Sequence, residues 1–171
     1  ALDYDDVNGV QSGHHSAPLI GPLFALGEMR RMSGRRLIAA YVIGVETEIR
    51  LARTMNAVRF HHYDKGWHPT ATMGTFGAAA AASFLLGLDR SCTAKALALA
   101  ASMASGIKAN FGTMTKPLHV GQCSRNGLFA ALAAERGFEA NPGALEHKQG
   151  FLEVYNGPGL YDAERMFENW G

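Results

Sequence analysis

The sequence has little cysteine, no excess of either charge and no long apolar run. Its two cysteines, Cys92 and Cys123, lie far apart and outside any CxxC pattern, so neither a disulfide framework nor a zinc knuckle is expected. Sixteen basic and fifteen acidic residues give a net charge of +1, which provides no electrostatic preference for nucleic acid or an anionic membrane. The alanine-rich segments fall short of the about 18 to 20 apolar residues that span a bilayer. We therefore expect a cytoplasmic protein that binds neither nucleic acid nor membranes.

The sequence consists instead of apolar segments of helical length, which are separated by glycine and proline. With 171 residues and 47% hydrophobic content, the chain is long enough for one domain with a core. We expect an all-α domain in which one helix begins near Pro18 and another follows Ser33. The second helix carries an apolar stripe at i+4 steps, formed by Leu37, Tyr41, Val45 and Ile49.

The first turn of this second helix contains Arg35 and Arg36, which oppose the helix dipole. A tertiary partner or a bound anion would relieve the conflict. A solvent-exposed basic turn is the interpretation that we favour.

Two alanine-rich helices are expected at the centre of the domain, over residues 69–86 and 91–105. Pro69 suits a first helical position, and Gly87 can take the left-handed conformation that ends a helix. Gly106 is expected to end the second of these helices. Their small side chains permit close packing.

The rest of the chain continues the helical pattern. A helix runs from Thr115 or Lys116 to just before Gly137. Residues 141–142, an Asn-Pro pair, predict the start of a short helix. An amphipathic stripe near the end of the chain consists of Ala163, Met166, Phe167 and Trp170.

Two of the expected helices begin with the same arrangement, a polar side chain directly before a proline. His68 precedes Pro69, and Lys116 precedes Pro117. A helix N-terminus presents unpaired N–H groups and about half a positive charge, so it attracts anions and disfavours a protonated imidazole. A neutral His68 can act as a base, and Lys116 can hold a substrate carboxylate. An exposed capping imidazole and a surface ammonium are the structural alternatives.

The N-terminal segment adds carboxylates and two adjacent histidines. Asp3, Asp5 and Asp6 precede His14 and His15, so a carboxylate is available to orient an imidazole for proton transfer. The adjacent histidine pairs of the chain match no HxxxH or HExxH pattern, and we expect no metal site. An acidic turn with exposed histidines is the alternative interpretation.

Four segments of the sequence closely resemble the MmgE/PrpD family: "ALDYDD", "GHHSAP", "GWHPTATMGTFGAAAAAS" and "NFGTMTKPLHVGQCSRNG". The resemblance covers nearly the whole chain. It implies an all-α, Ala/Gly-rich helical bundle domain, present in part over residues 1–171. Within residues 155–171 we expect the start of the junction to an α/β lid domain that the chain does not contain. The resemblance also implies a homodimer and no cofactor.

The family includes 2-methylcitrate dehydratase, cis-aconitate decarboxylase and iminodisuccinate epimerase, which act on small di- and tricarboxylates. The resemblance implies that Asp3, His14 and His68 are catalytic and that Lys116 binds substrate. Val7 departs from the threonine of decarboxylase-like members. The implied reaction is of the lyase type and begins with proton abstraction next to a carboxylate, with dehydration of a 2-methylcitrate-like substrate favoured. Decarboxylation, epimerisation and a non-catalytic anion-binding module are the alternatives, and without the lid we expect the chain alone to be inactive.

Overall fold

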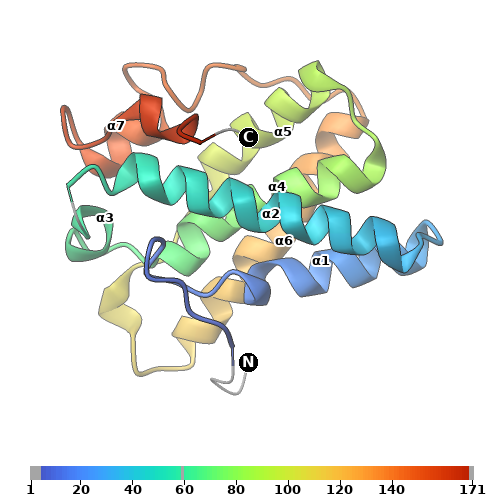
Figure 1. Ribbon diagram of the computed structural model, residues 1–171, viewed down its shortest axis with the longest axis horizontal. Coiled ribbons are helices and arrows are strands. Elements are labelled where there is room, and N and C mark those ends of the chain that lie inside the picture. The colour runs from blue at the N-terminus through green and yellow to red at the C-terminus, as the bar shows by residue number, and fades with distance from the viewer. Residues whose placement is uncertain (1–4, 59, 170–171) are drawn as a thin grey trace.

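The computed structural model describes residues 5–58 and 60–169, which fold into a bundle of helices (Figure 1). The elements are α1 (Ser16–Met29), α2 (Gly34–Met55), α3 (His61–Asp64), α4 (Pro69–Leu86), α5 (Arg90–Met103), η1 (Lys108–Asn110), α6 (Thr115–Glu135), α7 (Phe151–Asn156) and η2 (Ala163–Met166). These residues contain two isolated β-bridges but no strand, which confirms the predicted all-α class. None of the described helices combines the length and the apolar character needed to cross a membrane.

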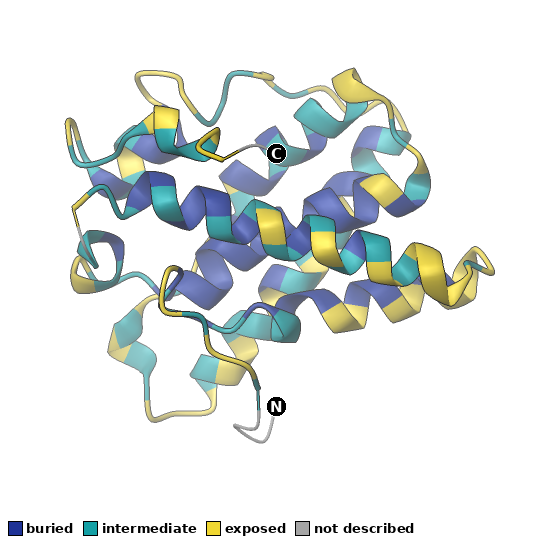
Figure 2. Cartoon of the chain, viewed as in Figure 1, coloured by how far each residue is buried: buried dark blue, intermediate teal, exposed yellow. Residues whose placement is uncertain are grey.

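Helix α4 forms the centre of the bundle and is buried along nearly its whole length (Figure 2). Its bounds agree with the predicted range 69–86, and Gly87 ends it in the left-handed region at φ +70°. It packs against α1, α2, α5 and α6. A Cβ at Gly74 would overlap Pro18 of α1, and a Cβ at Gly127 of α6 would overlap the α4 backbone. Small side chains therefore set the spacing between α4 and its neighbours.

Helix α2 crosses in front of α4 (Figure 1), and its N-cap residue is Ser33, whose side chain accepts a hydrogen bond from the Arg36 N–H. The predicted stripe lies beside the buried face, because its four members are only half-buried. The fully buried line runs instead through Ala40, Gly44, Glu48, Leu51 and Met55. Alanine and glycine allow the closest approach to α4, so the larger side chains flank the line of contact.

The basic first turn of α2 has a tertiary partner. The Arg36 guanidinium donates hydrogen bonds to the carbonyl oxygens of Phe84 and Leu85, both at 3.2 Å, at the C-terminal end of α4. A cation at this end complements the dipole of α4 and supplies donors for its last carbonyls. Arg35 and Arg36 are both exposed, as predicted, but Arg36 also has the tertiary partner that the sequence left as an alternative.

Helix α5 differs from the prediction in its position and in its end. It spans Arg90–Met103 and stops before the extended residue Ala104, so Gly106 does not end it. Only four of its residues are buried: Ala96, Ala98, Ala100 and Ala101. The helix packs on α4 and α6 without being enclosed. Alanine favours helices by its intrinsic propensity as well as by burial, so an alanine-rich circumference does not require a central position.

The segment after α6 consists mostly of turns. The helix predicted to start at residues 141–142 is replaced by a turn in which Asn141 Oδ1 accepts a hydrogen bond from the Gly143 N–H at 3.0 Å. Such local bonds compete with helix initiation. The predicted C-terminal stripe forms only the short 3-10 helix Ala163–Met166, and its last member, Trp170, lies outside the described residues. Arg50 of α2 donates hydrogen bonds to two carbonyls of this last segment, which therefore packs on α2.

Candidate active site

His68 occupies the N-cap position of α4 and is almost fully buried, with 3% of its surface exposed. Its N–H donates a hydrogen bond to the Gly106 carbonyl at 3.0 Å, and its own carbonyl accepts bonds from the first turn of α4. The imidazole makes no capping bond to the helix. Burial, followed by the charges of His119, Lys116 and His14, lowers the pKa of His68 to about 4. The ring is therefore neutral near pH 7.

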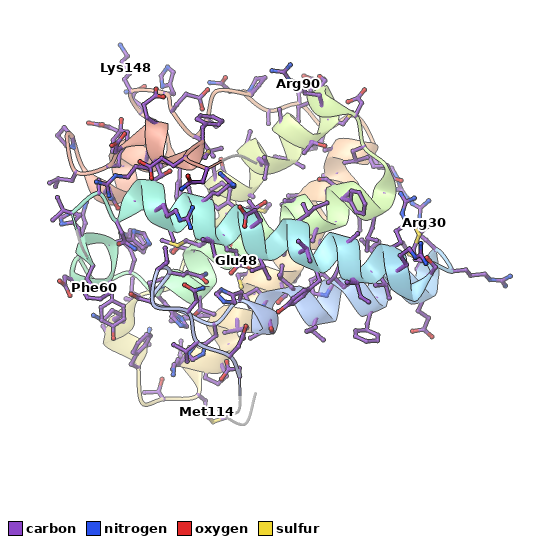
Figure 3. The ribbon with its side chains drawn as sticks, viewed as in Figure 1. Arg30, Glu48, Phe60, Arg90, Met114 and Lys148 are labelled. Atoms are coloured by element: carbon purple, nitrogen blue, oxygen red, sulfur yellow. The ribbon has the colours of Figure 1, made fainter. Side chains whose placement is uncertain are left out.

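A cavity of about 460 Å³ brings together His14, His68 and Lys116, which lie far apart in the sequence. Asp5, the loop at residues 112–114 and the first two turns of α6 complete its walls. Met114 marks this loop at the lower margin of the molecule in Figure 3. Three of the four predicted site residues thus share one cavity. The fourth, Asp3, lies outside the described part of the chain.

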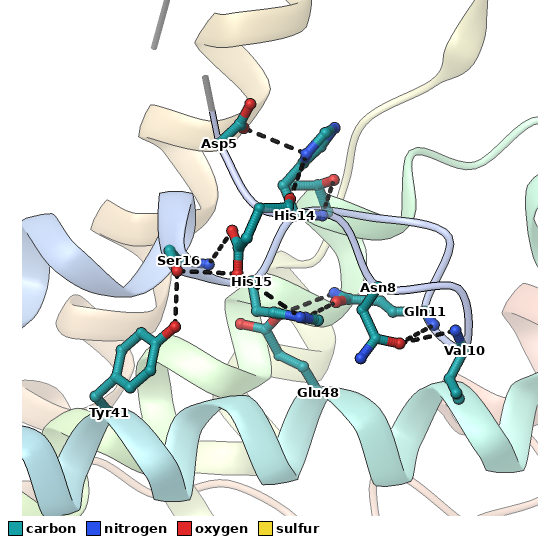
Figure 4. A network of polar contacts seen from close by, with 11 residues as sticks. Asp5, Asn8, Val10, Gln11, His14, His15, Ser16, Tyr41 and Glu48 are labelled. Atoms are coloured by element: carbon teal, nitrogen blue, oxygen red, sulfur yellow. Dashed lines mark hydrogen bonds and ion pairs between the residues drawn. The ribbon is translucent and has the colours of Figure 1, made fainter. Parts of the chain in front are cut away.

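His14 is held by polar groups of its own loop (Figure 4). Its Nδ1 lies 2.7 Å from the Asp6 carbonyl oxygen and 3.5 Å from Asp5 Oδ2. Its backbone N–H donates to Thr70 Oγ1 at 3.1 Å, which ties the loop to the first turn of α4. Since both neighbours of Nδ1 are acceptors, Nδ1 carries a hydrogen and Nε2 is left to exchange a proton. Among the described residues, Asp5 thus places a carboxylate beside His14. The catalytic role that the family resemblance implied for Asp3 stays a prediction.

Lys116 lies in the first turn of α6, directly before Pro117, and lines the cavity. Its Nζ lies 5.3 Å from the centroid of the Phe111 ring, within the range of a cation–π contact. Among the residues that the structure describes, no carboxylate forms an ion pair with it. The N–H groups at the start of α6 are paired, because those of Thr115 and Lys116 donate to Thr113 and that of Leu118 donates to the Met114 carbonyl. The ammonium group, at the positive end of the α6 dipole, is therefore what the helix start offers to an anion.

His119 is a residue at this site that the sequence analysis missed. It lies one turn after Lys116 on α6, and its Nδ1 is 3.2 Å from Nδ1 of His68. Burial lowers the pKa of His119. The i+3 spacing in "KPLH" places Lys116 and His119 on neighbouring positions of one helix face, so the pattern was present in the sequence. The contact with His68 was not, because it joins residues 51 positions apart.

A second polar network lies beneath the N-terminal loop, outside the cavity (Figure 4). Gln11 donates from Nε2 to Glu48 Oε2 at 2.8 Å, and Gln11 Oε1 lies 2.6 Å from His15 Nδ1. Glu48 is fully buried on α2, near the middle of the molecule in Figure 3. Burial raises the pKa of Glu48 well above its usual range, so the uncharged carboxyl group is favoured. The two adjacent histidines thus have different surroundings: His14 faces the cavity and His15 faces this network.

His62 is buried in the core and does not line the cavity. Its Nε2 lies 2.8 Å from Thr72 Oγ1, its Nδ1 lies 3.3 Å from Asn156 Oδ1, and Trp67 and Tyr155 stack on its ring. Burial lowers the pKa of His62 to about 4. Throughout the described ranges, no group of three or more His, Cys, Asp or Glu side chains is placed to hold a metal ion.

Comparison with known proteins agrees with the family resemblance seen in the sequence. The family model of the MmgE/PrpD N-terminal domain matches residues 1–163. The chain is 36% identical to the cis-aconitate decarboxylase of Homo sapiens over 159 residues, which cover 91% of this chain and 32% of that protein. It is 31% identical to the cis-aconitate decarboxylase of Aspergillus terreus over 162 residues, which cover 91% and 33% of the two chains. The chain therefore spans about a third of the length of these curated relatives.

Proposed function

Because the chain belongs to the MmgE/PrpD family, we propose that it forms the helical part of an enzyme that transfers a proton at a carbon next to a carboxylate. The substrate in this proposal is a small di- or tricarboxylate, and no cofactor takes part. The observation that carries the proposal is the cavity shared by His14, His68 and Lys116. It combines a neutral imidazole, a cation and a second imidazole in a volume suited to a small acid.

Lys116 and His68 perform the first step in this proposal. The ammonium group, at the positive end of the α6 dipole, binds a substrate carboxylate and lowers the charge of the enolate-like intermediate. This makes the neighbouring proton easier to remove. His68 accepts that proton, because its neutral ring lines the same cavity.

His14 performs the second step. Its Nδ1–H is held by the Asp6 carbonyl and lies near the Asp5 carboxylate, so the imidazolium form of the ring delivers its second proton from Nε2. In a dehydration that proton goes to the leaving hydroxyl after His68 has taken the proton from carbon. In a decarboxylation the electron pair comes from the broken bond to CO₂ instead, so His68 takes no proton, and the proton from His14 goes to the carbanion that remains. Either outcome uses the same anion-binding group.

The named relatives favour decarboxylation of cis-aconitate over the dehydration of a 2-methylcitrate-like substrate that the sequence alone favoured. Both acids are small tricarboxylates. Both fit a cavity of about 460 Å³. The cavity volume therefore does not distinguish the two acids, and the products formed from each have to be compared by experiment.

We propose a cytoplasmic homodimer as the working form. Ile20, Phe24 and Ile38 are 44%, 64% and 67% exposed and line an apolar groove of about 470 Å³ between α1 and α2. Contiguous exposed apolar surface of this kind is typical of protein interfaces. The two cysteines are unpaired, which suits a reducing compartment.

Solvent-deuterium incorporation tests the proposed function. The longest natural polypeptide that contains this chain is incubated in D₂O with cis-aconitate, 2-methylcitrate, citrate or iminodisuccinate, and NMR follows the exchange and the products. We expect exchange at a carbon next to a carboxylate, lost in His68→Ala and retained in His147→Ala, an exposed histidine outside the cavity. Binding of the acids without any exchange would instead support the non-catalytic anion-binding module.

A further inference from the structure

The rings of His68 and His119 contact each other through their Nδ1 atoms. Their Nδ1 atoms are 3.2 Å apart, and their ring centroids are 5.4 Å apart. Gly106 makes room for this contact: a Cβ there would lie 3.3 Å from His119 Nδ1 and 3.1 Å from the Ala71 side chain, and its φ is +112°. The Gly106 carbonyl also accepts the His68 N–H. Gly106 thus holds the backbone of His68 and leaves space for the ring of His119.

A hydrogen bond between two Nδ1 atoms links the tautomers of the two rings. One Nδ1 must carry the hydrogen and the other must present its lone pair. If His68 donates, its Nε2 has a free lone pair and can accept a proton. If His119 donates, the hydrogen of His68 is on Nε2 and the ring cannot act as a base.

We propose that His119 is a positioning residue which accepts the Nδ1–H of His68 and thereby keeps the Nε2 lone pair of His68 directed at the cavity. His68 lines the cavity and His119 does not, so the edge of the His68 ring away from the shared bond faces the substrate side. The proposal rests on the proposed function, because it assigns His68 the role of base.

The charges around the cavity favour this direction of the hydrogen bond. Lys116 lines the same cavity as His68, and α4 begins directly after His68. A positive side chain and the positive end of a helix stabilise a lone pair that faces them and disfavour an N–H in its place. Phe111, which contacts the His68 ring edge-on at 4.8 Å between centroids, limits reorientation of that ring.

Nitrogen-15 NMR of the histidine rings tests the proposal without any substrate. In the purified protein near pH 7.5, we expect His68 as the Nδ1–H tautomer and His119 as the Nε2–H tautomer, with the resonances assigned by comparison with His68→Gln. In His119→Asn the amide oxygen takes the place of Nδ1, so His68 should keep the Nδ1–H form. In His119→Phe the acceptor is gone, and the Nδ1–H form of His68 should lose its majority.

The deuterium-exchange assay provides the functional part of the test. His119→Phe should lower the exchange rate about tenfold or more through kcat, as expected when a base has the wrong tautomer, while KM changes little because His119 does not line the cavity. His119→Asn should restore most of the rate. An Nε2–H tautomer of His68 in the unmodified protein, or an unchanged tautomer in His119→Phe, would overturn the proposal. An inactive protein with the expected tautomers would count against the proposed function and not against this hydrogen bond.

Discussion

Replacing Glu48 by Gln should make the stability of the protein less sensitive to a rise in pH. Glu48 is fully buried, its Oε2 accepts a single hydrogen bond from Gln11, and its Oε1 has no partner within the described residues. A Cβ at Gly77 of α4 would overlap this carboxyl group, so the group packs directly against α4. Glutamine has the same shape as the uncharged acid and can accept the same bond from Gln11.

The sign of the effect follows from the raised pKa of Glu48. In the unfolded chain this glutamate ionises near its ordinary pKa of 4.5, whereas the folded state holds the proton to much higher pH. The unfolded state is therefore increasingly favoured as the pH rises from the unfolded pKa toward the folded one. Over that window the unmodified protein should lose up to about 1.4 kcal/mol of unfolding free energy per pH unit relative to Glu48→Gln.

Urea denaturation followed by circular dichroism measures this difference. His62 and His68, whose pKa values are lowered to about 4, lose stability as the pH falls below the unfolded histidine value, but they are present in both proteins and cancel in the comparison. The difference in unfolding free energy should therefore rise steadily between about pH 5 and pH 7. Glu28→Gln, at an exposed site on α1, should show no such rise. A difference between the unmodified protein and Glu48→Gln that does not change with pH would refute the assignment of an uncharged, buried carboxyl group.

Three further predictions concern the site and the core. His68→Ala should lower turnover about a hundredfold or more while folding is retained. In the unmodified enzyme, the base limb of the kcat/KM profile should inflect near pH 4, because His68 must be neutral to act. An inflection near the usual histidine pKa would contradict this. Lys116→Ala should raise KM and lower kcat in steady-state assays, whereas Lys148→Ala, at an exposed position, should change neither. Ala80→Phe should lower the urea midpoint by the equivalent of about 1 to 3 kcal/mol, because Ala80 is only 7% exposed in the centre of α4; an unchanged midpoint would argue against tight packing there.

The parts of the fold that the sequence predicted well are those set by local chemistry. Pro69 and Gly87 mark the two ends of α4, and Ser33 caps α2, because these residues act within one turn of their own position. The end of α5 was predicted wrongly because Gly106 uses its positive φ in the loop that contacts His68. A tertiary partner of Arg36 was considered but its identity was not predictable, since the partners lie 48 and 49 residues further along the chain.

In the candidate site, too, the sequence predicted the residues with a local signal and not the contacts between distant segments. Helix-terminus chemistry pointed to His68 and Lys116, and family resemblance added His14, and the structure places all three around one cavity. His119 became apparent only from a distance across the fold, and of the N-terminal aspartates that the sequence offered, the distance to His14 pointed to Asp5. Pairing between distant segments has no local pattern, so a single sequence does not reveal it.

The arrangement of the cavity has a consequence for how such a protein can diversify. The core depends on α4, where almost every position is buried and bulk is excluded. The rim of the cavity, in contrast, comes partly from the loop at residues 112–114, where Met114 is 91% exposed. Changes in this loop alter what the cavity admits without disturbing the packing of the helices. Selection for a new acid can therefore act on a few surface positions while the buried scaffold stays constant.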